Sequence, residues 1–408
     1  MELRFIKLCS RRCKQMVEIL NNAPSPEISY FASLVVDLRL HKTMELPFGS
    51  LNSRPSGIVE IDIETPSGTY SGYGEGATLP IPLFTDDSAA TVSGAGAFLL
   101  RKIRSEGPIG ISQALDIIQD TEFPKGEKFP TARMMIEMAL LDAYAKSMGK
   151  SMGELLGIPQ TLKSIPYGKS IGVGTSKEII EEANMSLKAG ASKIKLKITP
   201  SSHQEVIKAI NKLKSGGKFE IMVDANGSFD PENKAHIKIL KTIDKLGLLM
   251  IEEPVSRVGR LKGIEAVKKL RQSVNLDTPI CLDDCLTDLE TTIHAIDQGY
   301  ADVVNIKPGR IGSIIKSVEL GSYCQQKKIQ IMVGGMLEAT PGRCMTVTLA
   351  ALFQSLGSNI PGDLSLPKER LYEDLVDDPE VLKYTPDGQI TIPTGPGWGF
   401  GKIKIFGY

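Results

Sequence analysis

The chain has 408 residues, 41% of them hydrophobic and 24% charged, which is typical of a globular protein with more than one domain. Lysine plus arginine and aspartate plus glutamate are equal at 48 each, so net charge gives no reason to expect nucleic acid or an anionic membrane as a partner. No apolar run is long enough to span a membrane, and the charged start MELRFIKLCSRRCKQMVEIL is unlike a secretory signal. We therefore expect a cytoplasmic protein whose six cysteines are free thiols.

The first part of the chain has mixed α+β patterns. Residues 1–28 form a basic, weakly amphipathic extension, and residues 29–150 are predicted to form an α+β domain. The stretch IVEIDIE at 58–64 alternates apolar and acidic residues as a strand does, and TPSG at 65–68 predicts a turn into a return strand. A helix is predicted from Pro130, with apolar residues at helical spacing.

From about residue 160, short apolar strands alternate with helical stretches. The predicted strands are IPYGKSIGVG, SKIKLKI, FEIMVDA, LLMIEEP, PICLDD, DVVNIKPG and KIQIMVGG. Strand–helix units repeating at roughly 24 to 31 residues imply parallel strands, and seven or eight units imply a closed (β/α)7-8 TIM-type barrel. We place the barrel at 151–355 and its last loop and C-terminal segment at 356–408. The structural rival is an open doubly wound sheet, but no G-x-G-x-x-G follows a strand.

Charged residues stand at the carboxyl ends of five successive predicted strands. In chain order they are Lys197, Asp224, Glu252 (followed by Glu253), Asp283 (followed by Asp284) and Lys307. Each alone is typical of a helix cap or a solvated residue. Together, three carboxylates at adjacent strand ends would repel one another unless a cation neutralised them, and an all-oxygen ligand set favours Mg²⁺ or Mn²⁺.

The lysines are the candidate acid–base groups, because none of the four histidines falls at a predicted strand end. In KIKLKI at 193–198, Lys195 and Lys197 are expected to face the barrel interior, whereas Lys193, at the start of the strand, is expected to be solvated. A divalent cation and a second ammonium nearby would lower a lysine pKa from its usual value of about 10.4 toward neutrality.

Six motifs carry a resemblance to a known family. They are K-x-K at 195–197, D-A-N at 224–226, I-E-E-P at 251–254, L-D-D at 282–284, N-I-K-P-G-R at 305–310 and G-G-M-L-E at 334–338. The chain resembles the enolase superfamily over about residues 30–370. Within its muconate lactonizing enzyme subgroup, the chain is most similar to the o-succinylbenzoate synthase / N-acylamino acid racemase family.

The resemblance implies a role for each matching residue. The Mg²⁺ ligands would be Asp224, Glu252 and Asp283, and Asn226 and Asp284 would support them from a second layer. Lys197 and Lys307 would be the acid–base pair on opposite faces of the substrate, with Lys195 beside Lys197. The residues implied to contact substrate are Ser170, Arg54, Gly335, Met336, Leu337, Glu338 and Asp363. The first domain would cap the barrel mouth, with a loop around Leu46–Arg54 closing over the substrate.

Some residues depart from the family pattern. The fifth strand reads LDDC where the family has Asp-Glu followed by Ser, which leaves Asp284 as an alternative ligand to Asp283. Lys169 is expected to add a charge near the pocket, and Pro341 to reshape the seventh loop. The partner implied is a small carboxylate substrate, and we expect a homo-oligomer.

The resemblance implies an Mg²⁺-dependent enzyme that removes the proton α to a carboxylate through an enediolate. The leading activities are o-succinylbenzoate synthase, a dehydration, and N-acylamino acid racemase. Muconate cycloisomerase-like and dipeptide epimerase activities are alternatives, although an epimerase is expected to carry Asp-x-Asp where this chain has IPGDLSLP with the single Asp363. Two further alternatives are an inactive barrel acting as a binding protein and a Schiff-base aldolase.

Overall fold

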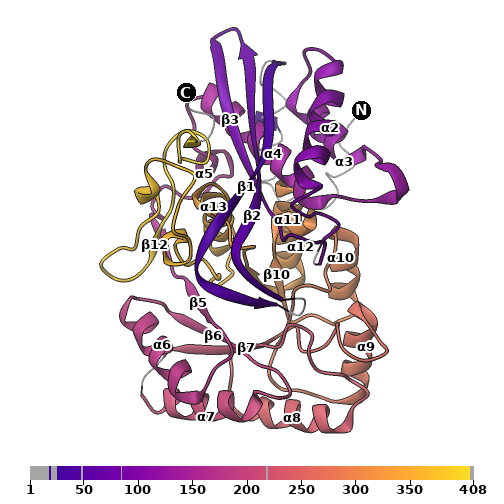
Figure 1. The fold of residues 1–408 in the computed structure, drawn as a ribbon, viewed down its shortest axis with the longest axis vertical. Coiled ribbons are helices and arrows are strands. Elements are labelled where there is room, and N and C mark those ends of the chain that lie inside the picture. Colours follow the sequence, from indigo (N-terminus) through magenta and orange to yellow (C-terminus); the bar gives the residue numbers. More distant parts are fainter. Residues whose placement is uncertain (1–17, 20–24, 47–48, 84, 217–218, 405–408) are drawn as a thin grey trace.

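The structure is a computed structural model that describes residues 18–19, 25–46, 49–83, 85–216 and 219–404. Most of the predicted extension 1–28 therefore lies outside the described residues. A three-stranded antiparallel sheet belongs to an N-terminal domain, and a seven-stranded parallel sheet forms a barrel below it (Figure 1). Across the described residues, no helix is both long and apolar enough to cross a bilayer.

The N-terminal sheet has the order β1-β2-β3. Its strands are β1 (Glu27–Leu46), β2 (Gly49–Thr65) and β3 (Gly68–Ala77). The alternation at 58–64 and the turn at 65–68 are confirmed, because Val59, Ile61 and Ile63 are buried and β3 begins at Gly68.

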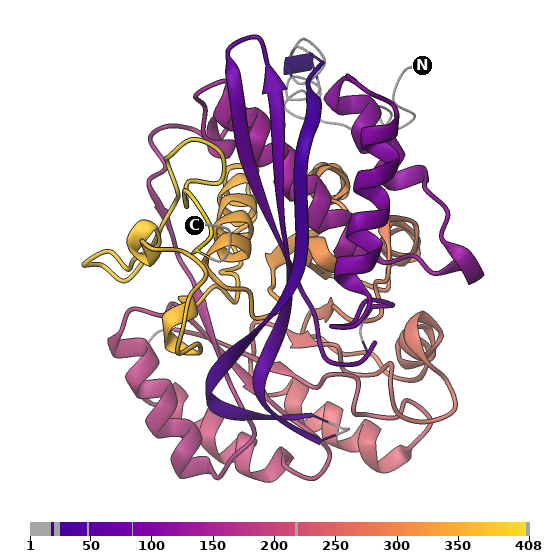
Figure 2. The same cartoon turned by 45° about the horizontal axis from the view of Figure 1, so that its top comes forward.

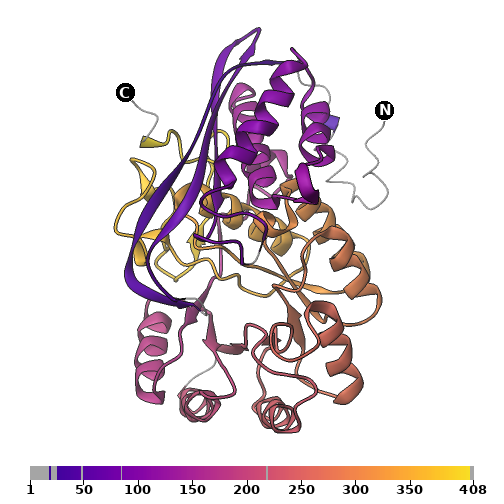
Figure 3. The same cartoon turned by 45° about the vertical axis from the view of Figure 1, so that its right-hand side comes forward.

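Strands β1 and β2 form a long hairpin that was not predicted from the sequence. The prediction of a loop around Leu46–Arg54 is wrong for 49–54, which continue strand β2, while 47–48 lie outside the described residues. Figures 1 and 3 show the hairpin running from the N-terminal sheet down to the barrel. It is held there by backbone hydrogen bonds, such as His41 N to Arg370 O at 2.8 Å, and by the ion pair of Lys42 with Glu182 at 3.6 Å.

Four helices follow the N-terminal sheet. They are α2 (Val92–Ser105), α3 (Ile111–Asp120), α4 (Pro130–Ser147) and α5 (Met152–Leu155), with the 3₁₀ turn η1 (Pro124–Gly126) before α4. Helix α4 begins at Pro130 as predicted, and Asp87 caps it by accepting the N–H groups of Thr131 and Ala132 at 2.8 and 3.0 Å.

Helix α4 is buried on all sides rather than along one stripe, because it packs against β3 on one face and against barrel elements on another. Its approach to the sheet requires glycine. A Cβ at Gly74 would lie 2.0 Å from the Met135 carbonyl oxygen, closer than any real Cβ contact. The sequence GYGEG places such glycines on the face of β3 that meets α4.

All seven predicted barrel strands are present, and they pair in parallel in chain order. The strands are β5 (Gly168–Ile171), β6 (Lys193–Lys197), β7 (Glu220–Asp224), β8 (Ile251–Glu252), β9 (Ile280–Leu282), β10 (Val303–Ile306) and β11 (Gln330–Val333). The helices between and after them are α6 (Ser176–Lys188), α7 (His203–Lys214), α8 (Lys234–Asp244), α9 (Gly263–Ser273), α10 (Leu289–Asp297), α11 (Pro308–Ile311), α12 (Ile314–Lys327) and α13 (Thr340–Ser355).

A short segment after α13 joins the two edges of the parallel sheet. Gly362 O accepts the N–H of Gly168 in β5 at 2.7 Å, and Asp363 N donates to Val333 O in β11 at 3.2 Å. The predicted barrel fold is confirmed, with this segment in the place of an eighth strand. Pro341 does not reshape a loop as predicted, because it lies in the first turn of α13, a position that favours proline.

The C-terminal segment returns to the N-terminal domain. It contains the 3₁₀ turns η2 (Pro367–Glu369) and η3 (Pro379–Val381), and strand β12 (Ile390–Thr391), which pairs with β4 (Ser164–Ile165). Figure 2 shows this yellow segment along one side of the molecule. The buried Trp398 donates its backbone N–H to Asp142 at 2.9 Å and its ring N–H to Met138 O at 3.0 Å, both in α4.

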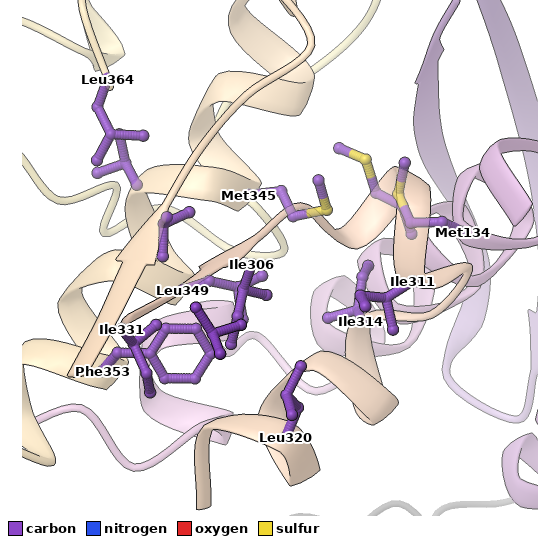
Figure 4. Packing of buried hydrophobic residues seen from close by; sticks show 14 of the residues in the cluster. Met134, Ile306, Ile311, Ile314, Leu320, Ile331, Met345, Leu349, Phe353 and Leu364 are labelled. Carbon is purple, nitrogen blue, oxygen red and sulfur yellow. The ribbon is translucent and has the colours of Figure 1, made fainter. Parts of the chain in front are cut away.

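One hydrophobic core runs through both parts of the molecule. Figure 4 shows Met134 of α4 close to Met345 of α13, to Ile311 at the end of α11 and to Ile314 at the start of α12, with Ile306 of β10 further along. The N-terminal domain and the barrel are thus packed through buried side chains, which fixes the domain over the strand ends.

Candidate active site

The three lysines of β6 share the inner face of the barrel. Alternate residues of a strand point to the same side, so Lys193, Lys195 and Lys197 line the interior in order along the strand. The prediction that Lys193 is solvated is wrong, because its side chain is 0% exposed. Gly168 on the adjacent strand makes room for it, since a Cβ there would lie 2.3 Å from Lys193 Cε.

Lys195 lies among three carboxylates. Its Nζ is 3.2 Å from Asp224 Oδ2, 3.0 Å from Glu252 Oε2 and 2.5 Å from Asp363 Oδ2. Asp363 also pairs with Lys193 Nζ at 3.1 Å. The segment that closes the barrel therefore supplies the counter-charge for two interior lysines, which would otherwise be costly to bury.

Lys197 stands at the mouth end of β6 and is the more exposed of the inner lysines. Its Nζ donates to Asp224 Oδ2 at 2.6 Å and to Asn226 Oδ1 at 2.5 Å. Asn226 has a positive φ of 43°, and its N–H donates to Asp224 Oδ1 at 2.9 Å. Asn226 therefore contacts both the carboxylate and the lysine, as expected of a residue that holds them in place.

On the opposite side, Asp283 is held by two cations. Lys307 Nζ donates to Asp283 Oδ2 at 2.7 Å, and Arg310 Nη1 donates to Asp283 Oδ1. Asp283 is buried, whereas Asp284 turns to Arg257 at 2.6 Å and lies 3.8 Å from Lys307. Of the two aspartates in LDDC, the structure thus places Asp283 directly against the candidate acid–base lysine.

Glu252 and Glu253 are both fully buried and make different contacts. Glu252 Oε1 accepts the Asn305 amide at 2.8 Å. Glu253 turns the other way and accepts the N–H groups of Asp283 and Cys285 at 2.8 and 3.1 Å, which fixes the end of β9. Glu253 has a φ of 39°, a left-handed conformation that is strained for this residue type and is often found at functional sites.

The electrostatics of the site follow from burial and pairing. Burial, with the Asp224 carboxylate adding to it, raises the pKa of Glu252 to about 8. Burial opposes ionisation of Asp224 and Asp283 too, but Lys197 with Lys195, and Lys307 with Arg310, outweigh it and lower the pKa of these two carboxyls. The pKa of Glu252 is raised because the cation that it contacts, Lys195, is shared with two other carboxylates. The pKa of Asp224 and Asp283 is lowered because each of them contacts a further cation.

Burial would lower the pKa of Lys307, but the charges of Asp283 and Asp284 outweigh it and raise that pKa. The predicted lowering toward neutrality therefore does not come from the protein groups alone. A divalent cation on the same carboxylates would oppose their effect on the lysine.

Asp224 and Glu252 end the adjacent strands β7 and β8, Asp283 directly follows β9, and all three are buried. Their donor chemistry, carboxylate oxygen only, fits Mg²⁺. Within the described ranges, no group of three His, Cys, Asp or Glu residues is arranged as it stands to hold a metal ion. Each of the three carboxylates contacts a lysine ammonium instead.

Several residues predicted to contact substrate lie at the barrel mouth. Ser170 is exposed and stands opposite Lys195 on the neighbouring strand β5. Gly335, Met336 and Leu337 are partly exposed and follow β11. Gly334 beside them is in close contact with the site, since a Cβ there would lie 2.9 Å from Lys307 Cε.

Other predicted contact residues are buried and already paired. Arg54 is 0% exposed and lies 3.7 Å from Glu75, and Glu338 pairs with Arg343 at 3.2 Å. Their contact with substrate stays a prediction. The expectation that Lys169 charges the pocket is wrong, because its neighbours Gly168 and Ser170 align with the inward-facing lysines of β6 and Lys169 pairs with Glu369 outside the barrel.

Three residues of the site were not singled out by sequence reasoning. Arg310 and Asn305 belong to the N-I-K-P-G-R motif, and Glu253 is the second acid of I-E-E-P. The sequence could have indicated them, because each motif contains polar residues in addition to the one placed at the strand end. The link between Lys193 and Asp363 had no sequence signal, because it spans the closure of the barrel.

The fold and these residues define a class of enzyme: a (β/α) barrel with acids at adjacent strand ends, lysines on either side and an N-terminal domain over the mouth. Comparison with known proteins agrees. The family model "Enolase C-terminal domain-like" matches residues 178–401. An o-succinylbenzoate synthase of Bacillus subtilis is 29% identical over 91% of this chain and 94% of its own length.

Two further proteins show the same likeness. An N-succinylamino acid racemase of an Amycolatopsis species is 31% identical over 83% of this chain and 86% of its own length. A solved enolase-superfamily member from Enterococcus faecalis V583 has a TM-score of 0.79 and 25% identity over 93% of this chain and 96% of that one. The chain belongs to the enolase superfamily and is an enzyme of that superfamily.

Proposed function

We propose that this enzyme removes the proton α to a substrate carboxylate, with Lys197 and Lys307 as acid–base groups on opposite sides of the substrate. The observation that carries the proposal is the pairing of each lysine with its own buried carboxylate, Asp224 for Lys197 and Asp283 for Lys307. The two lysines stand at the ends of β6 and β10, with the ends of β7, β8 and β9 between them. Two ammonium groups placed in this way can exchange protons with opposite faces of one carbon.

We propose Asp224, Glu252 and Asp283 as the residues that hold Mg²⁺ or Mn²⁺. Their repulsion supports this, because it contributes to the raised pKa of Glu252. The bound ion would supply electrostatic stabilisation of the negative charge that develops on the substrate carboxylate. Asn226, Asn305 and Arg310 orient the carboxylates and the lysine, and Ser170 and residues 335–337 line the substrate pocket.

The activity we propose is o-succinylbenzoate synthase, N-acylamino acid racemase, or both. The names of the relatives support these two. A dipeptide epimerase is the second candidate, but Asp363 is already bound to Lys193 and Lys195 and is poorly placed to grip a substrate ammonium. A cytoplasmic location, a homo-oligomer and domain boundaries near 28, 150 and 355 stay predictions.

The test is deuterium exchange by mass spectrometry. The protein with MgCl₂ in D₂O would meet N-succinyl amino acids, dipeptides, muconate and the hydroxycyclohexadiene precursor of o-succinylbenzoate. Deuterium gain in an N-succinyl amino acid indicates racemase chemistry, and loss of water from the precursor indicates synthase chemistry. Both should vanish in Lys307→Ala and Lys197→Ala and persist in the surface control Lys177→Ala. Product formed at the wild-type rate by both lysine variants would refute the assigned roles.

A further inference from the structure

Three arginines and two glutamates meet at the junction of the N-terminal domain and the barrel, next to the candidate site. Arg54 and Glu75 come from β2 and β3, Glu338 and Arg343 from the loop before α13 and its first turn, and Arg370 from the last loop. Arg54, Arg343 and both glutamates are buried, and Arg370 is partly buried. We call these five residues the arginine cluster.

The glutamates do not satisfy the arginines. Glu75 accepts the N–H groups of Ala339 and Gly342, both at 2.9 Å, so it caps α13, and its nearest contact with Arg54 is 3.7 Å. Glu338 accepts the N–H of Met336 at 2.6 Å and pairs with one nitrogen of Arg343. Glu75 is thus engaged largely by backbone groups, whereas Glu338 gives one oxygen to a backbone N–H and the other to Arg343.

Five guanidinium nitrogens of the cluster are buried and have no hydrogen-bond partner among the described residues. They are Nε and Nη2 of Arg54, Nε of Arg343, and Nε and Nη2 of Arg370. One acceptor of the cluster, Glu338 Oε2, is likewise buried without a hydrogen-bond partner among the described residues, although it lies 3.2 Å from Arg343 Nη2. A buried donor that has no hydrogen-bond partner destabilises the fold, and a charged donor does so more strongly. Three cations facing two engaged anions also repel one another. Burial, with Arg343 adding to it, lowers the pKa of Arg370 to about 9, and burial lowers the pKa of Arg54.

We propose that the arginine cluster is a binding site for a small monovalent anion, either a halide or a carboxylate group. Guanidinium N–H groups match such acceptors in charge and in geometry, and one anion would bring the cluster to neutrality. The inference rests on the unpaired nitrogens and does not depend on the proposed reaction.

The cluster borders the candidate active site. A Cβ at Gly334 would lie 2.9 Å from Lys307 Cε, and one at Gly335 would lie 3.1 Å from Nη1 and Nη2 of Arg343. The anion could therefore come from two sources, a free ion from solution or the carboxylate of a molecule bound at the barrel mouth. In either case it would tie the hairpin strand β2 to the last loop and to α13.

A direct test is bromide. Crystals of the full chain soaked in sodium bromide should show an anomalous difference peak within hydrogen-bond distance of Arg54 and Arg370. In solution, raising sodium bromide or sodium formate at constant ionic strength, balanced with the bulky anion gluconate, should raise the thermal midpoint by a few degrees. Arg370→Gln should lose this rise, and Arg260→Gln, which removes an exposed charge elsewhere, should keep it.

Absence of the bromide peak would overturn the proposal, and so would equal midpoint shifts in wild type and a folded Arg370→Gln protein. The crystal soak uses the unmodified protein, so it decides the matter even if the variant folds poorly. A competition arm separates the two sources. Loss of the bromide peak on adding an N-succinyl amino acid would assign the site to a substrate carboxylate, and persistence of the peak would assign it to a free anion.

Discussion

Lys193 and Asp363, which lie far apart in the sequence, form a 3.1 Å ion pair inside the barrel, and the Lys193 side chain is fully buried. The pair joins the first residue of β6 to the segment that closes the sheet. Because water cannot solvate Lys193, its charge depends on Asp363 for compensation.

Removing that compensation should destabilise the protein strongly. We expect Asp363→Asn to lower the free energy of unfolding by about 3–5 kcal/mol, as for other buried pairs that lose one partner. Urea unfolding followed by circular dichroism measures it. The double variant Lys193→Met with Asp363→Asn should recover more than half of the loss, and Glu232→Gln, from an exposed pair, should change nothing measurable. A double variant as unstable as the single one would show that Lys193 is not the reason.

The packing of Lys193 against Gly168 of the neighbouring strand β5 can also be tested. In Gly168→Ala the new methyl group would lie 2.3 Å from Lys193 Cε, and we expect a loss of about 1–3 kcal/mol from overpacking. The matched control is Gly172→Ala, just after the same strand, where nothing lies within 4 Å of the added atom. Chemical denaturation of both proteins measures the difference. Equal stabilities of the two variants would contradict the packing described for β5 and β6.

Glu137 should give the protein a stability that depends on pH. It lies in α4, accepts the N–H of Ile315 at 2.7 Å, and burial raises its pKa to about 7 from an ordinary value of 4.5. Between about pH 4.5 and pH 7 this carboxyl is ionised in the unfolded chain but still protonated in the folded protein. The free energy of unfolding is therefore highest below about pH 4.5 and falls by about 3 kcal/mol as the pH rises to about 7. Unfolding of wild type and Glu137→Gln across pH 5 to 8 measures it, and the difference between the two should shrink to a constant above pH 8. Parallel curves for the two proteins would refute the assignment.

Divalent metal should stabilise the fold through the acids at the strand ends. We expect MgCl₂ to raise the thermal midpoint of the wild type relative to NaCl of the same ionic strength, because an ion bound only to the folded state adds its binding free energy. Glu252→Gln keeps the size of the side chain and should lose most of this rise, whereas Glu265→Gln on the surface of α9 should keep it. An equal rise in all three proteins would indicate a metal site elsewhere.

Strand periodicity predicted the barrel well, because each strand is a short apolar run between helices and that pattern is local. The ends of the strands, and with them Lys197, Asp224, Glu252, Asp283 and Lys307, followed from the same pattern. The predictions that were wrong depend on contacts between residues far apart in the sequence. Lys193 was expected in solvent because its partner Asp363 is brought to it only by closure of the barrel. The strand at 49–54 was expected to be a loop because it is held by pairing with β1, and β1 in turn is held by hydrogen bonds to Arg370 and Tyr372, far along the chain.

The segment at Gly362 and Asp363, which joins β5 to β11, also affects how the chain folds. Until Gly362 and Asp363 have been synthesised and docked, β5 and β11 present open hydrogen-bonding edges, which invite pairing with other chains. The last step depends on contacts between distant parts of the sequence, and such contacts form slowly. A growing chain released before residue 363 would therefore expose both edges and leave Lys193 without its carboxylate, so premature termination should yield aggregates rather than a smaller barrel.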